Sequence, residues 1–416
     1  MEERWSVRPT SHRESVPFNR PWASDAELTY TREALMSSHR QGDGRFTERC
    51  HAWLEQHTRT EKALLTTSCT AALEMAALLI DVGPGDEVIM PSFTFVSTAN
   101  AFVLRGAVPV FVDIDPMTQN IAPEKIEAAI TPRTKAIVPV HYAGIACDMD
   151  AIMAIAERHR LFVIEDAAQG LLAYHKGRHL GTIGHLGALS FHDTKNVSCG
   201  EGGALLINDR QFIDRALIIR EKGTNRQQML LGLADKYTWV DIGSSFLPSE
   251  VTAAFLLAQL EAAHETCEDR RATWYAYHAA FEPLAAERVV QRPAVPPNSR
   301  HNGHLYYLLL RDGRARDEFI RQLRACGIGA PFHYVPLHTS PAGRRFCRTH
   351  GPMRATIDAG ERLVRLPLWR NMPASTVAAV TEQAIWAAQK REFAPEESPR
   401  ARPEPQPPLA FARPES

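Results

Sequence analysis

Short apolar and β-branched runs alternate with helix-like stretches between about Thr60 and Asp209, and this alternation limits the possible folds more than any other feature. The runs GDEVIM, PVFVDI, KAIVPV and LFVIED have the length and continuous apolar character of buried strands. Helical periodicity fills 97–105, 123–130 and 149–160, and Pro84 with Gly85 is predicted to end the first helix. Alternating strands and helices predict βα units in a mainly parallel sheet, so the fold class is α/β.

The predicted pattern of secondary structure changes near residue 250. A long helical pattern covers 249–280, and after a proline-broken stretch the run HLYYLLL is a strand candidate. A chain of 416 residues exceeds the size of one ordinary core. We expect an N-terminal extension at 1–16, a large domain at 17–250 and a small α+β domain at 251–392. Residues 393–416 are dense in proline and charge and are predicted to be disordered.

Charge and cysteine usage narrow the class of protein. The 47 basic and 48 acidic side chains nearly cancel, so no overall field favours binding to nucleic acid or to an anionic membrane. The seven cysteines form no CxxC pair, which argues against a disulfide framework and against a metal site. The charged N-terminus lacks the apolar core of a signal peptide. We expect a cytoplasmic protein that acts on small molecules.

Polar residues directly after the predicted strands are the first candidates for a site, because ligands of open parallel sheets bind beyond the carboxyl ends of strands. Asp166 follows LFVIE, and its carboxylate can pair with a protonated heterocyclic nitrogen or simply cap the next helix. Ser190 lies near the end of the run GALSF, and Lys195 follows this run in SFHDTKN. A lysine kept from water has a lowered pKa and can act as a nucleophile, although most single lysines are surface residues.

The segment TTSCTAALEMAALL places small polar residues before a helix, so the backbone N–H groups of Cys69 and Thr70 are candidates for binding an anion. Ordinary capping by Ser68 is the alternative. Phe93 and Phe95 follow the GDEVIM strand, where a ring can stack on a planar cofactor or pack in the core. The glycines of CGEGGALLI are interpreted as structural support for the loop that carries Lys195.

Taken in order, the strings SCTAAL, PSFTFVSTANA, IEDAAQG and SFHDTKN with GEGG resemble the sugar aminotransferases of the DegT/DnrJ/EryC1/StrS family over about residues 17–390. The resemblance implies fold type I of the pyridoxal phosphate (PLP)-dependent transferases, the fold of aspartate aminotransferase. It implies that Lys195 forms a Schiff base with PLP and carries the proton between substrate and cofactor. By the same resemblance, Asp166 pairs with the pyridine nitrogen, Gln169 contacts the phenolic oxygen and Phe95 stacks on the ring.

The resemblance also implies how the phosphate and the substrate are held. Backbone groups of Cys69 and Thr70 and the Ser190 hydroxyl would bind the phosphate, with Ser245 as a further donor from the second subunit of a homodimer. Much of the family has asparagine at the Ser245 position, arginine at the position of Leu247 and glycine at the position of Cys69, so the chain departs from the common pattern there. Substrate contacts are expected from His333, Tyr334 and His338.

Longer strings point to one branch of the family. EKGTNR, DKYTWVDIGSSFLPSE and FHYVPLHTSPAG resemble the enzymes that make dTDP-4-amino-4,6-dideoxygalactose from dTDP-4-keto-6-deoxyglucose with L-glutamate as amino donor. Dehydratases that resemble this family carry histidine at the Lys195 position, so the lysine favours transamination. A UDP-linked or 3-keto sugar is an alternative substrate. A PLP-binding regulator without catalysis is an alternative from another class, which the combination of a nucleophile and an electron-sink partner disfavours.

Overall fold

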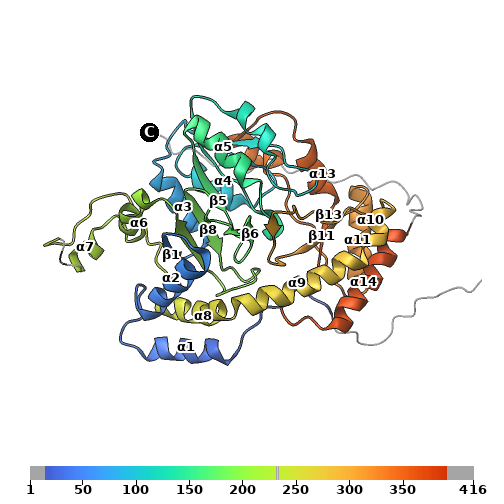
Figure 1. The fold of residues 1–416 in the computed structure, drawn as a ribbon, viewed down its shortest axis with the longest axis horizontal. Helices are drawn as coiled ribbons and strands as arrows, with labels where there is room; N and C mark the ends of the chain where they lie inside the picture. Colours follow the sequence, from blue (N-terminus) through green and yellow to red (C-terminus); the bar gives the residue numbers. More distant parts are fainter. Residues whose placement is uncertain (1–14, 231, 233, 391–416) are drawn as a thin grey trace, which may run out of the picture.

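The computed structural model describes residues 15–230, 232 and 234–390, and its central feature is an eight-stranded sheet (Figure 1). The strands of this sheet are β1 (Lys62–Thr66), β2 (Glu87–Pro91), β3 (Val108–Val112), β4 (Thr134–Ile137), β5 (Phe162–Asp166), β8 (Leu186–Ser190), β9 (Gly203–Ile207) and β12 (Arg348–Thr349). Their order is β1-β9-β8-β5-β4-β2-β3-β12. The pairs from β8 to β12 are parallel, and β1, β9 and β8 pair antiparallel. The predicted α/β class with a mainly parallel sheet is confirmed.

Helices cover both faces of this sheet, because alternate side chains of each buried strand point to opposite sides. Leu65 and Val163 point to one face of the sheet and pack against one group of helices. Their neighbours Leu64 and Ile164 point to the opposite face and pack against a second group. The first group is α2 (Arg45–Thr58), α5 (Met149–His159) and α8 (Glu250–Glu261); the second is α3 (Cys69–Leu79), α4 (Val96–Val103) and α6 (Ile213–Arg220). Helix α1 (Asp25–Met36) packs outside α8.

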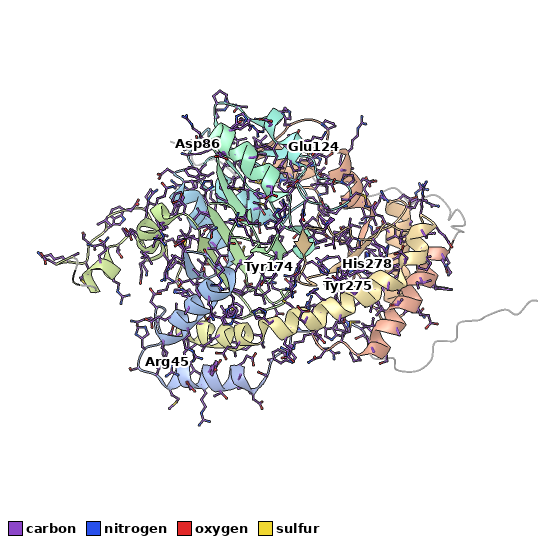
Figure 2. All side chains as sticks on the ribbon, viewed as in Figure 1. Arg45, Asp86, Glu124, Tyr174, Tyr275 and His278 are labelled. Atoms are coloured by element: carbon purple, nitrogen blue, oxygen red, sulfur yellow. The ribbon has the colours of Figure 1, made fainter. Side chains whose placement is uncertain are left out.

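A separate apolar cluster holds the C-terminal elements together. These elements are α9 (Ala263–Ala280), α10 (Glu282–Ala286), β11 (Tyr306–Leu309), α11 (Gly313–Ala325), β13 (Leu363–Leu366) and α14 (Ala374–Gln389). Two further C-terminal helices, α12 (Pro341–Phe346) and α13 (Arg354–Arg362), lie outside this cluster. Tyr275 and His278, labelled in Figure 2, lie on α9, and the His278 ring stacks on Trp274 at 4.6 Å between centroids. Helix α9 extends from α8 toward α10, α11 and α14 in Figure 1.

Small elements complete the described chain. They are β6 (Tyr174–His175), β7 (Arg178–His179), β10 (Ser299–Arg300), α7 (Arg226–Leu230) and the 3₁₀ turns η1 (Pro123–Lys125), η2 (Glu127–Ala129), η3 (Tyr142–Gly144), η4 (Arg210–Phe212) and η5 (Leu337–Thr339). Helix α7 extends away from the body of the molecule in Figure 1. All seven cysteines are free thiols in this structure. Within the described chain, no helix is both long and apolar enough to cross a membrane.

Residues 16–22, called the N-terminal strap here, lie on the C-terminal elements although they precede the large sheet in sequence. The Val16 N–H donates to the Gly327 carbonyl at 2.8 Å, and the Gly329 N–H donates back to the Val16 carbonyl at 2.8 Å. The guanidinium of Arg370 lies 3.5 Å from the centroid of the Trp22 ring. These contacts have no signal in the sequence, which predicts residues 17–22 as part of the large domain. The division into domains at residue 250 stays a prediction.

Some local predictions were wrong. The predicted helix at 123–130 is two 3₁₀ turns, η1 and η2, which are joined at Ile126. The first helix ends at Leu79, before Pro84 and Gly85, because the backbone turns at Ile80. The helical pattern at 249–280, in contrast, is confirmed, as the two consecutive helices α8 and α9 that meet at Ala262. The proline-rich tail at 393–416 and most of the N-terminal extension lie outside the described residues.

Candidate active site

A cavity of about 610 Å³ lies beyond the carboxyl ends of β5 and β8, where the C-terminal elements face the large sheet. Its walls include these residues predicted from the sequence: Cys69, Thr70, Phe95, Asp166, Gln169, Ser190, Lys195, His333 and Tyr334. Ser245 and His338 are not among the lining residues. The cavity therefore lies where ligands of parallel sheets ordinarily bind, next to the polar residues that follow the strands.

Lys195 is a half-buried residue on the loop after β8. Its backbone N–H donates to the His192 carbonyl at 2.9 Å, which holds the loop, while its Nζ has no hydrogen bond or ion pair with any residue that the structure describes. Burial lowers the pKa of the Lys195 amine, and the nearby Asp166 carboxylate opposes this effect. An amine with a lowered pKa and no partner is available as a nucleophile and as a proton carrier.

Asp166 is the last residue of β5 and is only 4% exposed. Its Oδ2 accepts a hydrogen bond from the Thr98 hydroxyl at 2.7 Å, and its Oδ1 accepts one from the Ala168 N–H at 3.1 Å. The Thr94 and Thr98 hydroxyls are 2.7 Å apart. Because the Thr98 hydrogen is used on Asp166, Thr94 donates to Thr98. This chain of donors fixes the orientation of the carboxylate.

Thr98 was missed by sequence reasoning. A threonine in an apolar helix carries no motif of its own, and its hydroxyl ordinarily satisfies itself locally. The available signal was its spacing of four residues from Thr94, which directly precedes Phe95, the N-cap of α4, and whose hydroxyl lies 2.7 Å from that of Thr98.

Gln169 is held at both ends of its side-chain amide. Its Oε1 accepts from the Ala143 N–H at 2.6 Å, and its Nε2 donates to the Tyr334 hydroxyl at 2.9 Å. The Tyr334 ring stacks on His333 at 3.7 Å between centroids. The His333 Nδ1 lies 2.7 Å from the Tyr142 hydroxyl, and burial lowers the pKa of His333 well below its usual value. Neutral aromatic side chains thus form this wall.

The N-terminus of α3 faces the cavity with free donors. Ser68 caps the helix by accepting from the Ala71 N–H at 3.0 Å, and the N–H groups of Cys69 and Thr70 have no acceptor among the described residues. A Cβ on Gly203 would lie 2.3 Å from the Ser68 carbonyl carbon, so only glycine lets β9 pass this close to the helix. The capping role and the anion-binding geometry coexist here.

The two phenylalanines after β2 have different environments. Phe93 is 1% exposed and packs edge-on against Tyr142 at 5.1 Å between ring centroids. Phe95 is 59% exposed, although it lines the cavity. The cavity wall at Phe95 is therefore open on its outer side.

The residues predicted for the site but absent from the cavity lie at identifiable places. Ser245 is exposed and pairs through its backbone with Glu221, so it does not reach the cavity of its own chain. His338 lies on η5, where its Nδ1 is 2.8 Å from the Ser92 hydroxyl. His338 thus contacts the loop after β2 and not the cavity.

Cationic side chains of the C-terminal elements were also missed. Arg270 on α9 is 4% exposed and donates to the carbonyls of Gly303 and His304 at 3.2 and 2.6 Å. Burial lowers the pKa of Arg270 to about 10. Arg365 on β13 and the strap residue Phe18 also line the cavity. Nothing in a strand such as RLVRLPL distinguishes an arginine that faces a cavity from one that faces water.

A buried hydrogen-bonded pair, His141 with Glu165, lies next to Asp166. His141 Nε2 and Glu165 Oε2 are 2.8 Å apart, and both side chains are fully buried. The Cys147 N–H donates to His141 Nδ1 at 3.2 Å, so the ring hydrogen of His141 is on Nε2 and is donated to Glu165. Glu165 also accepts from the N–H groups of Gly181, Ile183 and Gly184. This network makes the floor of the cavity rigid.

Comparisons with known proteins agree with this geometry. The spore coat polysaccharide biosynthesis protein SpsC of Bacillus subtilis is 34% identical over 375 residues, which cover 88% of this chain and 95% of SpsC. The aminotransferase TlmJ from Streptoalloteichus hindustanus has a TM-score of 0.82 at 29% identity and covers 90% of this chain and 99% of its own. The sugar aminotransferase Spr1654 from Streptococcus pneumoniae, solved in its PLP form, has a TM-score of 0.83 at 26% identity and covers 90% of this chain and 99% of its own.

A family model matches residues 23–384, nearly the whole of the described chain. The family resemblance seen in the sequence motifs is thereby confirmed, and with it the fold expected from them. The chain belongs to the DegT/DnrJ/EryC1/StrS aminotransferase family.

Proposed function

We propose that this chain is a cytoplasmic enzyme that transfers the amino group of L-glutamate to the 4-keto carbon of dTDP-4-keto-6-deoxyglucose, giving dTDP-4-amino-4,6-dideoxygalactose. Membership of an aminotransferase family supports the reaction class. The observation that carries the proposal is the unpartnered amine of Lys195 in one cavity with the fixed carboxylate of Asp166, among the residues that the structure describes. The choice of donor, nucleotide and sugar rests on the branch-specific strings between residues 221 and 343.

The cofactor is pyridoxal phosphate, and the relative Spr1654 has been solved in both its PLP and PMP forms. The residues of the cavity fit this group. The free N–H groups at the start of α3 and the Ser190 hydroxyl suit its phosphate. Lys195 suits its aldehyde, and Asp166 suits its pyridine nitrogen. We assign Gln169 to the phenolic oxygen and Phe95 to the ring face.

Pyridoxal phosphate supplies an electron sink for the carbon that loses its proton. With the cofactor bound, Lys195 Nζ would take that proton and return it at the neighbouring position, a role that burial favours by lowering the pKa of the amine. The Asp166 carboxylate, held by Thr98 and Ala168, would pair with the pyridine nitrogen of the bound cofactor and keep it protonated. Gln169 and Tyr334 exclude water from one wall and orient the ring substituents. His333 and Tyr334 are proposed to contact the sugar, and we retain His338 as a more distant substrate contact.

We also propose a homodimer in which Ser245 of one chain reaches the phosphate site of the other. Ser245 is exposed and lies outside the cavity of its own chain. The preceding segment exposes large apolar side chains, with Tyr237 52%, Trp239 76% and Ile242 53% accessible. Phe95 is open on its outer side as well. Exposed apolar side chains in this segment and at Phe95 favour cover by a second copy.

The proposed dimer is tested by complementation between variants. Lys195→Ala and Ser245→Trp chains are each expected to be impaired alone. Mixing and refolding them together should restore activity in the hybrid, because one of its sites carries both intact residues. Absence of any recovery in a mixture that chromatography shows to be dimeric would refute the shared site.

The proposed reaction is tested by incubating the purified enzyme with PLP, L-glutamate and dTDP-4-keto-6-deoxyglucose, and determining the configuration of the amino sugar by NMR. We expect an axial amine at C4 and no product from Lys195→Ala. An equatorial amine would contradict the assigned product. Turnover only with UDP-linked or 3-keto sugars would contradict the substrate, and no turnover with any keto sugar would contradict the enzymatic function.

A second variant separates catalysis from cofactor binding. Asp166→Asn keeps the shape and the contact with Thr98, but its neutral amide cannot hold the proton of the pyridine nitrogen. We expect bound PLP and a loss of turnover of at least about 100-fold. Turnover within twofold of the wild type would remove Asp166 from the mechanism.

A further inference from the structure

Arg365 presents a guanidinium group to the cavity without an anionic partner in the described part of the chain. It lies on β13, where its backbone N–H donates to the Pro331 carbonyl at 2.9 Å and its Nη2 donates to the Phe332 carbonyl at 2.9 Å. Its Nε is buried and has no acceptor among the described residues. No carboxylate within residues 15–230, 232 and 234–390 forms an ion pair with it. Most of its hydrogen-bonding capacity is therefore unused.

The groups around Arg365 leave its charge uncompensated. The guanidinium lies 4.5 Å from the centroid of the Phe18 ring, which covers it from the strap side. The ionisable groups that respond to its charge are Lys195, His304, His333, Tyr142 and Tyr334. Burial lowers the pKa of both histidines well below their usual value and raises the pKa of both tyrosines, so these four groups are uncharged near neutral pH.

The acidic groups of the cavity interact with residues other than Arg365. Both oxygens of Asp166 accept hydrogen bonds, from Thr98 and from Ala168. Glu201 is exposed, and its Oε1 lies 3.6 Å from His192 Nε2. The wall formed by the C-terminal elements therefore carries positive charge without a counter-charge from the described residues, and burial lowers the pKa of Arg365 itself.

A planar guanidinium with free N–H groups matches a carboxylate in shape and charge. Building on the proposed function, we infer that Arg365 binds the α-carboxylate of the amino donor. Arg365 and Lys195 line the same cavity. The α-carboxylate is bonded directly to the carbon whose proton Lys195 moves, whereas the diphosphate of a nucleotide sugar is separated from the reacting carbon by the sugar ring. The geometry thus favours the donor carboxylate.

The two half-reactions test this inference separately. Stopped-flow absorbance follows conversion of the PLP form to the PMP form by L-glutamate, and then the return of the PMP form with the keto sugar. Arg365→Gln should raise the apparent dissociation constant for L-glutamate about 30-fold or more, as expected for loss of charged hydrogen bonds. The sugar half-reaction, started from the PMP form, should change less than threefold. Arg365→Lys should fall between the wild type and Arg365→Gln.

A matched control is Arg362→Gln on the adjoining end of α13. Arg362 donates to the Leu310 carbonyl at 2.6 Å and pairs with Asp358, and it does not line the cavity. This variant should leave both half-reactions unchanged. Calorimetric titration of the holoenzyme with 2-oxoglutarate gives a readout independent of turnover, and binding should weaken in Arg365→Gln but not in Arg362→Gln.

A donor series identifies which carboxylate is bound. The amine 4-aminobutyrate lacks the α-carboxylate of L-glutamate, and L-2-aminobutyrate lacks the side-chain carboxylate. Arg365→Gln should weaken L-glutamate and L-2-aminobutyrate by the same factor and leave 4-aminobutyrate unchanged. If Arg365→Gln weakened binding of L-glutamate and 4-aminobutyrate equally but left L-2-aminobutyrate unchanged, Arg365 would bind the side-chain carboxylate. If only binding of the keto sugar weakened, Arg365 would bind the diphosphate. Either result overturns the inference, whereas a wild type that no amino acid converts to the PMP form refutes the proposed function instead.

Discussion

The substitution Thr98→Val tests whether the orientation of Asp166 depends on a hydroxyl that the neighbouring helix α4 supplies. Valine has nearly the shape of threonine, but it lacks the hydroxyl that donates to Asp166 Oδ2 at 2.7 Å. Both side chains are buried, and water cannot easily replace the lost donor. A hydrogen bond to a charged group contributes about 2 kcal/mol. Without it, the carboxylate loses a bias of this size toward the orientation that faces the cavity.

A loss of about 2 kcal/mol corresponds to roughly a 30-fold decrease in kcat if the correct orientation of Asp166 is needed in the rate-limiting step. The assay is the steady-state rate at saturating donor and acceptor, with the visible spectrum recorded to show that the cofactor is bound. Thr98→Ser retains the hydroxyl and should keep kcat within threefold. Thr94→Val removes only the outer donor, 2.7 Å from Thr98, and should have a smaller effect. A Thr98→Val enzyme with wild-type kcat would refute the reasoning.

Three further predictions concern the anchor lysine, the close approach of β9 and a buried carboxylate. Lys195→Ala should abolish both the absorption band of the Schiff base between this lysine and PLP and transamination, and an unchanged spectrum would contradict the assignment. Gly203→Ala should release PLP during dialysis much faster than the wild type, because its Cβ would lie 2.3 Å from the Ser68 carbonyl carbon and displace the start of α3. Hydrogen bonds from Arg348, Thr131 and Arg133 lower the pKa of Glu87 from 4.5 to about 2. The resulting stabilisation of about 3 kcal/mol should be complete above pH 4.5 and lost as the pH falls toward 2. In urea unfolding, the difference in free energy of unfolding between wild type and Glu87→Gln should therefore shrink below pH 4.5. A difference that stays constant with pH would contradict this prediction.

The parallel strands could be predicted from sequence because both faces of each strand are buried. Runs such as LFVIED are continuously apolar, and this pattern needs no knowledge of distant contacts. For the segment 123–130, the same reading of sequence periodicity gave a wrong prediction. It has helical spacing, but Ile126 and Ala129 are buried by turns of a tighter helix, since the chain must return to β4 within a few residues.

The candidate site could be predicted where chemistry follows a strand and not where it depends on tertiary contacts. Asp166 and Lys195 stand in strings that occur together in one family, so their roles could be inferred from the sequence alone. Thr98 and Arg365 lie in ordinary helix and strand patterns, and their importance comes from what faces them. Phe18 could not be assigned to the cavity from the sequence. The backbone pairing of Val16 with residue 328 brings Phe18 to the cavity wall, and this pairing is a tertiary contact.

The route of the chain restricts how the molecule can move. The strap crosses to the C-terminal elements, α9 connects the two apolar clusters, and β12 returns to pair with β3 at the edge of the large sheet. If the C-terminal elements rotated relative to the sheet, the rotation axis would have to pass close to all three of these connections. Bending at only one connection would break the contacts at the other two. Entry and exit of a bulky ligand are therefore expected to depend on local rearrangement at the open wall near Phe95, not on a swing of whole domains.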